Sequence, residues 1–269
     1  MLLRELDYAR PESVDQAVQL LSAREDARAL AGGQSLVNVM KTRVAAPELV
    51  VDLNGIDALR GIQDDGGALV IGSMTTYAAI VDSPEIAAAR PILAEVARTI
   101  ADVQVRNRGT IGGNVCSNDP TNHFPPLLAV MGAEFTIRAA ESERTATADE
   151  FFEGVFATAV HPGELLTSIR VPAKGDARDG WASATLGKEG TGIVSVAATV
   201  SGGTARIAIG CVAATPVVVS ASADETAVRD AVRSADLDPP GDVHASADYR
   251  RRLAEVLAVR AVIAARERR

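Results

Sequence analysis

The feature that most constrains this chain is a glycine-rich stretch near its middle, Arg106-Asn-Arg-Gly-Thr-Ile-Gly-Gly-Asn-Val-Cys-Ser-Asn-Asp-Pro120. Glycine reaches positive φ angles and lets backbone N–H groups approach a ligand closely. Successive free N–H groups form an anion-binding concavity, to which Thr110, Ser117 and Asn118 add polar side chains. A Gly-Gly pair is also the ordinary signature of a turn. This stretch alone therefore leaves a phosphate cradle and a plain turn open.

A second glycine stretch lies nearer the N-terminus. Residues 27–31 predict a short buried strand that runs directly into Gly32-Gly33-Gln34-Ser35-Leu36. A strand, a glycine turn and a short helix in succession place N–H groups where a diphosphate is favoured. The stretch is not the G-x-G-x-x-G dinucleotide fingerprint, because it lacks the third glycine and the later acidic residue. Two separate glycine loops suit one extended ligand better than two coincidental turns.

Taken together, the two stretches resemble the flavin-binding motifs of the FAD subunit of molybdenum hydroxylases, the xanthine dehydrogenase and carbon monoxide dehydrogenase type enzymes. The resemblance covers nearly the whole chain and keeps the order of the family's motifs. The matching segments are Ala31–Leu36 with Met40-Lys41, Gln104–Gly113, Asp149–Gly154, Glu164–Ile169 and Ser246–Arg251.

The resemblance implies an α+β fold in two parts. Residues 1–174 would form an FAD-binding domain of two α/β subdomains, of the vanillyl-alcohol-oxidase (PCMH) type. Residues 175–269 would form a small C-terminal α+β domain with a three-stranded antiparallel sheet and helices. The Pro/Gly/Asp-rich segment 172–180 is a suitable boundary.

The local patterns agree with this division. Ser13-Val-Asp-Gln16 reads as a capping box before a helix whose apolar residues repeat at helical spacing. In the long helix that begins at Ser246, one apolar face is predicted from Leu253, Val256, Leu257 and Ile263. Further helices are predicted over 75–80, 91–100, 123–130 and 223–232, and strands over 48–52, 67–72, 134–138, 165–171, 181–186, 193–201 and 205–211.

The resemblance also assigns residues to the cofactor. Gly32, Gly33, Gln34 and Ser35 would hold the FAD diphosphate, with Ala31 and Leu36 closing the turn. The set that would contact diphosphate, ribityl chain or flavin is Thr110, Gly112, Gly113 and Asn114. Near the isoalloxazine the family places residues that match Ile100, Leu166 and Lys188. For Ile100 and Leu166 a role in core packing is equally open, and Lys188 is equally well read as a solvated loop charge.

His123 departs from the family pattern, since many members have aspartate at this position. An imidazole cannot reproduce the acceptor-only role of a carboxylate. Two roles stay open for His123: a hydrogen bond to a flavin or ribose oxygen, and capping of the helix that follows.

Composition excludes several other classes of protein. The formal net charge of −8 argues against nucleic acid or an anionic membrane as the main partner. There is no apolar run of about 20 residues that would span a bilayer, and residues 1–5 do not resemble a secretory signal. These features predict a cytoplasmic protein. Cys116 and Cys211 are too few and too far apart for an iron–sulfur or zinc site, which predicts two reduced thiols.

Nothing in the sequence resembles a hydrolytic constellation or a metal motif, so any chemistry requires a bound cofactor. The resemblance implies two partner chains, a small one with [2Fe–2S] clusters and a large one with molybdopterin. Electrons would pass through FAD to NAD⁺, a quinone or oxygen. Two alternatives stay open: a stand-alone FAD oxidoreductase of the vanillyl-alcohol-oxidase type, and a non-catalytic protein whose glycine loops are only turns.

Overall fold

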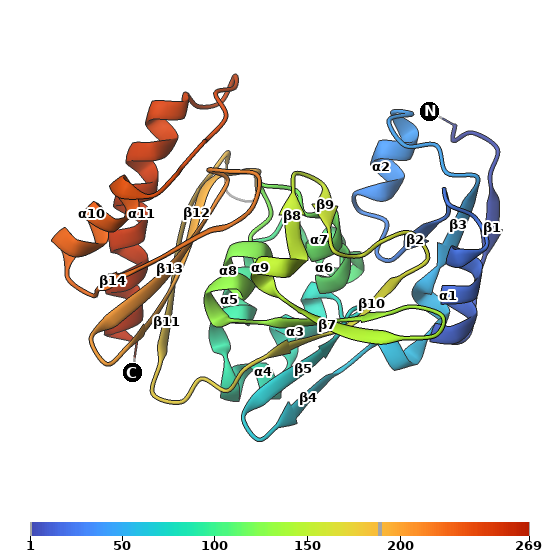
Figure 1. Cartoon of the computed structure of the whole chain (residues 1–269), viewed down its shortest axis with the longest axis horizontal. Helices are drawn as coiled ribbons and strands as arrows, with labels where there is room; N and C mark the ends of the chain where they lie inside the picture. Colours follow the sequence, from blue (N-terminus) through green and yellow to red (C-terminus); the bar gives the residue numbers. More distant parts are fainter. Residues whose placement is uncertain (1, 188–189, 269) are drawn as a thin grey trace.

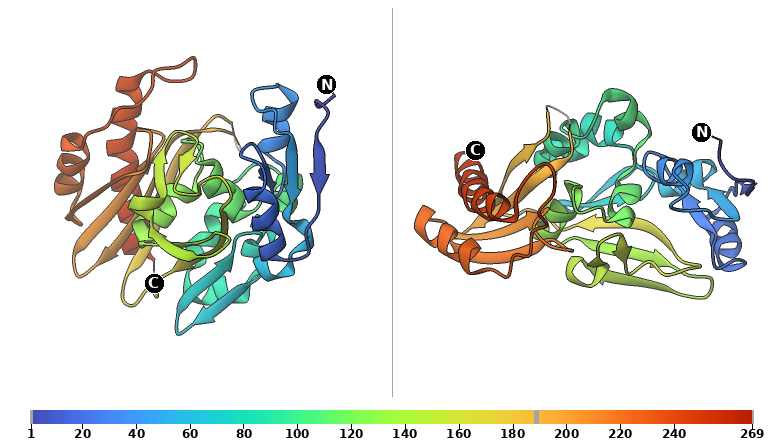
Figure 2. Two further views of the ribbon diagram at one scale, coloured as in Figure 1. Left: turned by 45° about the vertical axis from the view of Figure 1, so that its right-hand side comes forward. Right: turned by 90° about the horizontal axis from the view of Figure 1, so that it is seen from above.

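A computed structural model of the chain describes residues 2–187 and 190–268. Three sheets follow one another from the N-terminal end of the molecule to the C-terminal end (Figure 1). Both further views place the N-terminal and C-terminal portions at opposite ends, with the middle of the chain between them (Figure 2). The predicted α+β organisation is confirmed.

The first sheet is small and parallel. Its strands have the order β1-β3-β2, with β1 at Asp7–Ala9, β2 at Arg28–Leu30 and β3 at Leu49–Asp52. Parallel neighbours need a crossover connection, and α1 (Val14–Ser22) and α2 (Leu36–Lys41) lie in the two connecting segments. Ser13 caps α1 as predicted, because its Oγ accepts the N–H of Gln16 at 3.2 Å. The second half of the capping box is wrong in detail, since Gln16 Oε1 accepts the N–H of Glu12.

The second sheet is antiparallel and forms the centre of the molecule. Its strands are β4 (Ile62–Asp65), β5 (Ala68–Gly72), β6 (Glu134–Arg138), β7 (Glu143–Thr147) and β10 (Leu165–Val171), in the order β4-β5-β10-β6-β7. The central strand β10 thus joins two hairpins that are distant in sequence. A short hairpin of β8 (Phe152–Gly154) and β9 (Ala157–Thr158) lies beside this part of the fold.

Helices between β5 and β6 bury the apolar face of this sheet in the largest hydrophobic cluster. They are α3 (Tyr77–Asp82), α4 (Pro84–Ala89), α5 (Pro91–Arg98), α6 (Val103–Arg108), α7 (Ile111–Ser117) and α8 (Phe124–Met131), and a short α9 (Ala148–Phe151) follows β7. Two single 3-10 turns, Leu53–Gly55 and Asp57–Leu59, connect the first sheet to the second.

The third sheet has four strands, so the predicted three-stranded sheet is wrong by one strand. Its order is β11-β12-β13-β14, with β11 at Arg178–Thr185, β12 at Gly192–Ser201, β13 at Thr204–Gly210 and β14 at Val217–Ser222. β14 pairs with β13 along one edge of the sheet. As an edge strand it is half-exposed and lacks a clean apolar alternation, so its sequence carries a weak strand signal.

Helices α10 (Glu225–Ser234) and α11 (Ala247–Glu267) pack on the third sheet. The predicted face of α11 is only partly right, because Leu257 is buried whereas Ile263 is 42% exposed. Alanines make the closest contact instead: a Cβ added to Gly180 of β11 would lie 2.0 Å from the carbonyl oxygen of Ala261. Small residues on both elements therefore allow the helix to approach the strand.

The third sheet is attached to the centre of the molecule through buried polar and apolar contacts. Helix α8 contacts β12 and β13, and Arg206 donates to the carbonyl of Val130 at 2.9 Å. Between α4 and α5, Arg90 forms an ion pair with Asp179 of β11 at 2.6 Å, with both side chains at least 96% buried. Burying two charges costs desolvation free energy, which is offset only when the two groups are well aligned and hydrogen-bonded.

Candidate functional site

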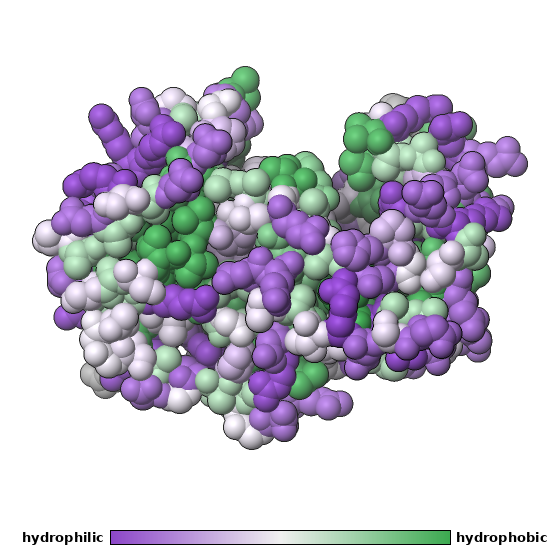
Figure 3. All heavy atoms as spheres, in the orientation of Figure 1, coloured by the Kyte–Doolittle hydropathy of each residue, from purple (hydrophilic) through white to green (hydrophobic). Residues whose placement is uncertain are grey.

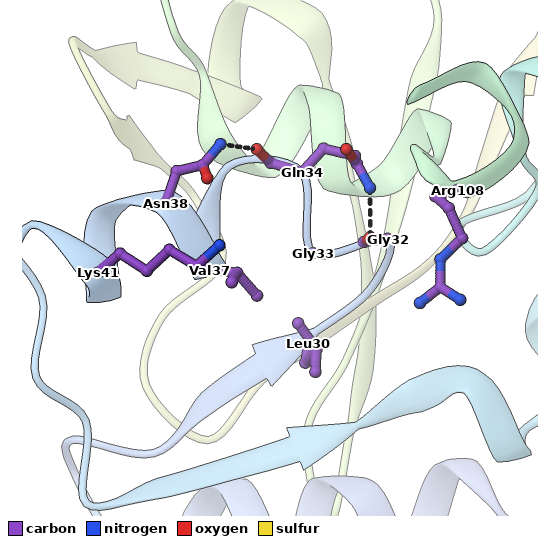
Figure 4. A pocket seen from close by; sticks show the side chains of 8 residues that line it. All are labelled: Leu30, Gly32, Gly33, Gln34, Val37, Asn38, Lys41 and Arg108. Carbon is purple, nitrogen blue, oxygen red and sulfur yellow. Dashed lines mark hydrogen bonds between the residues drawn. The ribbon is translucent and has the colours of Figure 1, made fainter. Parts of the chain in front are cut away.

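The first glycine stretch forms a tight turn between β2 and α2, as predicted. Gly33 has a φ of +73°, in the left-handed region that favours glycine. One side chain of the stretch and one of α2 stabilise the turn (Figure 4): Gln34 Nε2 donates to the Gly32 carbonyl at 3.1 Å, and Asn38 Nδ2 of α2 donates to the Gln34 carbonyl at 2.8 Å. The amide of Gln34 therefore shapes the turn rather than projecting freely from it.

The backbone N–H groups of this turn have no acceptor within the described ranges 2–187 and 190–268. No hydrogen bond from the N–H of Gly33, Gln34 or Ser35 occurs there. Backbone donors are rarely left without a partner unless water or a ligand accepts from them. Three consecutive donors on one turn form the kind of concavity that binds an anion.

Gly33 and Gln34 of this turn line a pocket of about 400 Å³. It is lined by Leu30, Gly32, Gly33, Gln34, Val37, Asn38, Lys41 and Arg108 (Figure 4). In the orientation of Figure 1, the surface is notched between α2 and the hairpin of β8 and β9 (Figure 3). The lining contains two cationic side chains and no carboxylate, so its charge suits an anionic ligand.

The second glycine stretch is helical, and here the predicted loop of free N–H groups is wrong. Residues 103–108 and 111–117 form α6 and α7. The N–H of Gly112 donates to the Ser73 carbonyl at 2.9 Å, and the N–H of Gly113 donates to Thr110 Oγ1 at 3.0 Å. Thr110 is thus the N-cap of α7, and these amides are used inside the protein.

Packing explains why several glycines of this stretch are needed. A Cβ on Gly112 would lie 2.5 Å from the Ser73 carbonyl oxygen, and one on Gly109 would lie 2.7 Å from the ring of Tyr77. Real Cβ contacts are longer than this, so another residue would displace its neighbour. The glycines let α7 approach the segment after β5, and they are not by themselves a sign of a ligand.

The two stretches are distant in the sequence and meet in the fold. A Cβ on Gly32 would lie 2.1 Å from the Arg108 carbonyl oxygen, and one on Gly113 would lie 3.5 Å from Cβ of Ala31. Asn114, which is 7% exposed, lies in the same helix as Gly113. Its side-chain oxygen has no hydrogen-bond partner among the described residues, and a buried orphaned acceptor of this kind calls for a ligand or water.

The flavin-end candidates lie in different environments. Leu166 of β10 is 2% exposed and belongs to the central core. Ile100 is half-buried against the same core and follows α5. Its carbonyl and that of Ala101 accept from Arg106 Nη1 at 3.0 and 2.6 Å, so Arg106 fixes this turn. Lys188 lies outside the described residues.

His123 is buried between the central part of the fold and the third sheet. Its Nδ1 lies 3.2 Å from Thr99 Oγ1, which also lies 2.7 Å from the Val96 carbonyl oxygen. Which of Nδ1 and Oγ1 donates depends on the tautomer of the imidazole. The ring is 5.2 Å from that of Trp181 in β11. Burial lowers the pKa of His123 to about 4, so the imidazole is neutral at pH 7.

These contacts bear on the capping role, one of the two roles left open for His123. It precedes α8, yet its side chain makes no capping bond there, so the capping role is wrong. A neutral imidazole has one donor nitrogen and one acceptor nitrogen. The hydrogen bond from His123 to a flavin or ribose oxygen stays a prediction.

Both cysteines are free, as the reduced thiols predicted from the sequence require. Burial raises the pKa of the Cys116 thiol to about 12 and that of Cys211 to about 11. Neither thiol is therefore activated as a nucleophile. Over residues 2–187 and 190–268, no group of three histidine, cysteine or acidic side chains is placed to hold a metal ion. In that same part of the chain, none of the helices is long and apolar enough to cross a membrane.

Comparison with known proteins gives full-length matches. Residues 4–174 match the family described as "FAD binding domain in molybdopterin dehydrogenase", and residues 182–265 match the "CO dehydrogenase flavoprotein C-terminal domain". The carbon monoxide dehydrogenase medium chain of Afipia carboxidovorans is 41% identical, over 100% of this chain and 99% of that protein. The nicotine 6-hydroxylase medium subunit of Paenarthrobacter nicotinovorans is 31% identical, over 98% and 99%.

A solved structure agrees with the sequence matches. A chain of reconstituted CO dehydrogenase from Oligotropha carboxidovorans superposes with a TM-score of 0.94 at 38% identity, covering 100% of both chains.

Proposed function

The chain belongs to the FAD-binding medium subunits of the molybdenum hydroxylases, and from this premise we propose how its own residues hold the cofactor and which partners it serves. The observation that carries the proposal is the first glycine turn. Its three N–H groups have no acceptor among the described residues, and Gly33 and Gln34 line a pocket with two cationic side chains beside the second stretch. That arrangement fits an extended dinucleotide whose diphosphate needs several donors.

The residues present fit FAD at both stretches. The backbone of Gly32, Gly33, Gln34 and Ser35 would hold the diphosphate, and Ala31 and Leu36 would close the turn. Asn114, whose side-chain oxygen is buried without a partner, would accept from a hydroxyl of the ribityl chain or ribose. Bound FAD supplies the redox chemistry, because it exchanges electrons both singly and in pairs.

The remaining site residues have three different proposed roles. We propose that the cofactor site is shaped by the packing of α7 against the first turn, which depends on Thr110, Gly112 and Gly113. Ile100, Leu166 and Lys188 keep the flavin-end role proposed from the family motifs, Leu166 from within the core. For His123 we propose a contact between the two domains, 1–174 and 175–269. The ranges of the two family matches, which end at 174 and resume at 182, support that division.

The partners follow from the relatives, which are named as medium chains or subunits of multi-subunit enzymes. We propose a small partner with [2Fe–2S] clusters and a large partner with molybdopterin. Electrons would leave through FAD to NAD⁺, a quinone or oxygen. The relatives named for carbon monoxide and for nicotine align over nearly their whole length with this one chain. The organic substrate is therefore selected by a partner, and no general acid or base is expected here.

The test is a visible absorption spectrum, with metal analysis, of the protein purified from its native cell without denaturation. We expect one FAD per chain, together with iron and molybdenum in a complex of three kinds of chain. Folded chain that contains no flavin and takes up none from added FAD would refute the proposal. A lone chain that binds FAD and oxidises a small molecule without partners would instead support a stand-alone oxidoreductase.

A further inference from the structure

Lys41 and Arg108 form a pair of cations that the family assignment leaves without a role. Lys41 is the last residue of α2, and Arg108 is the last residue of α6. Both line the pocket, and they lie on opposite sides of Gly33 (Figure 4). The elements that carry them are held together where Gly32 meets the Arg108 carbonyl. The fold, rather than the sequence, thus brings the two charges to one site.

Neither cation has a partner among the described residues. No carboxylate of residues 2–187 and 190–268 lies within ion-pair distance of either side chain. Some arginines at the surface do have such a partner: Arg24 pairs with Asp7 at 2.7 Å, and Arg229 with Glu225 at 2.8 Å. In a chain of net charge −8, two neighbouring cations that face one pocket form a local positive field.

The pocket supplies what a diphosphate requires beyond those charges. Its rim carries the unclaimed amides of the Gly33 turn, and its lining has no acidic side chain that would oppose an anion. Amides give directed hydrogen bonds, and ammonium and guanidinium groups give charge-assisted ones of about twice the strength. Neutral amides alone would hold any polar group, whereas two cations favour a ligand with two negative charges.

We propose that Lys41 and Arg108 bind the diphosphate of FAD from both sides of the Gly33 turn and thereby select FAD over flavins without a diphosphate. The proposal rests on the proposed function and adds the residues that set cofactor specificity. Riboflavin has no phosphate and FMN has a single one, so neither would use both cations. ADP carries the diphosphate without a flavin and would use both.

The experiment measures dissociation constants of flavin-free, folded complex for FAD, ADP and riboflavin, by flavin fluorescence and by competition with ADP. Lys41→Met and Arg108→Met should each weaken FAD and ADP roughly tenfold, the scale of one charge-assisted hydrogen bond. Riboflavin binding should not change. The affinity of the wild-type protein for FAD should fall as salt is added. It should fall more steeply than the affinity of the double variant Lys41→Met/Arg108→Met.

Control variants separate this role from a general charge effect. Arg252→Met removes an equivalent exposed charge on α11 and should leave all three affinities unchanged, while Lys41→Arg should retain most FAD affinity. Lys41 and Arg108 are exposed and make no side-chain hydrogen bonds in the described structure, so their variants should keep the wild-type melting temperature.

The outcomes distinguish the two levels of the proposal. Wild-type protein that binds none of the ligands would overturn the FAD-binding function itself. Wild-type protein that binds FAD, with variants of unchanged affinity, would overturn only the role of Lys41 and Arg108. Equal losses for riboflavin and ADP would also overturn that role, because they would place the two residues at the flavin end or in the fold.

Discussion

The buried ion pair of Arg90 and Asp179 offers a stringent test of how the third sheet is held in place. Arg90 Nη1 lies 2.6 and 2.7 Å from the two carboxylate oxygens of Asp179, and Nη2 donates to the Pro172 carbonyl at 3.2 Å. Among residues 2–187 and 190–268, the Asp179 carboxylate has one further partner, the hydroxyl of Thr199 at 3.0 Å. Arg90→Met would leave this carboxylate buried with a single neutral donor.

The magnitude follows from that loss. Removing one partner of a buried pair costs about 3–5 kcal/mol, since an uncompensated charge stays behind. This is a large part of the roughly 5–15 kcal/mol by which native domains are stable. For a chain of this size, about 2–4 °C of melting temperature is lost per kcal/mol. We therefore expect the melting temperature of Arg90→Met to fall by about 10 °C.

The assay is urea and thermal unfolding of the complex, followed by circular dichroism and by release of flavin. The double variant Arg90→Met/Asp179→Leu removes both charges and should recover most of the lost stability. The control Arg229→Met removes one partner of an exposed i,i+4 pair and should cost at most about 0.5 kcal/mol. A loss below about 1 kcal/mol for Arg90→Met, or no recovery in the double variant, would refute the reasoning.

Three further predictions concern the contact between the two glycine stretches, the buried imidazole of His123 and the buried thiol of Cys211. Gly32→Ala places a Cβ 2.1 Å from the Arg108 carbonyl oxygen. The substitution should lower the free energy of unfolding in urea by about 1–3 kcal/mol and weaken the binding of FAD. A variant with wild-type stability and affinity would contradict the close contact. Burial lowers the pKa of His123 from 6.5 to about 4, so between these values the unfolded chain binds the extra proton and stability falls as the pH falls. Between pH 7 and pH 4, the free energy of unfolding of the wild-type protein should fall by up to about 3 kcal/mol more than that of His123→Gln, as measured by urea unfolding of both proteins at each pH. An equal fall in both proteins would show that the imidazole is not buried. Because Cys211 is 4% exposed and burial raises the pKa of its thiol to about 11, this thiol should resist alkylation at pH 8 until the protein unfolds, and its rapid labelling in the native state would count against its burial.

Local patterns predicted most of the fold, because helices and strands with one buried face carry a periodic signal. The helix capped by Ser13 and the central strand 165–171 lie where they were predicted. The errors occur where a neighbour decides the outcome. The strand 217–222 is stabilised by pairing with β13 rather than by its own pattern. Ile263 is exposed because close packing on Gly180 favours the alanine face of α11.

The two glycine stretches show where the sequence ceases to predict the candidate site. A strand, two glycines and a short helix are local, so the first turn was predicted correctly. In the second stretch the sequence places glycines but does not say what approaches them. Gly112 is required by Ser73, and Gly109 by Tyr77, and both neighbours lie more than 30 residues earlier. A requirement for glycine thus has the same appearance in sequence whether a ligand or another backbone fills the space.

Arg108 illustrates the consequence for function. By sequence it belongs to the second stretch, whereas in the fold its carbonyl contacts Gly32 and its side chain lines the pocket of the first turn. Any change that moves α6 would therefore move a cation at the first turn, even if the turn itself stayed intact. The two stretches form one binding surface held at the contact of Gly32 with Arg108, so variants in either stretch should affect affinity for FAD non-additively.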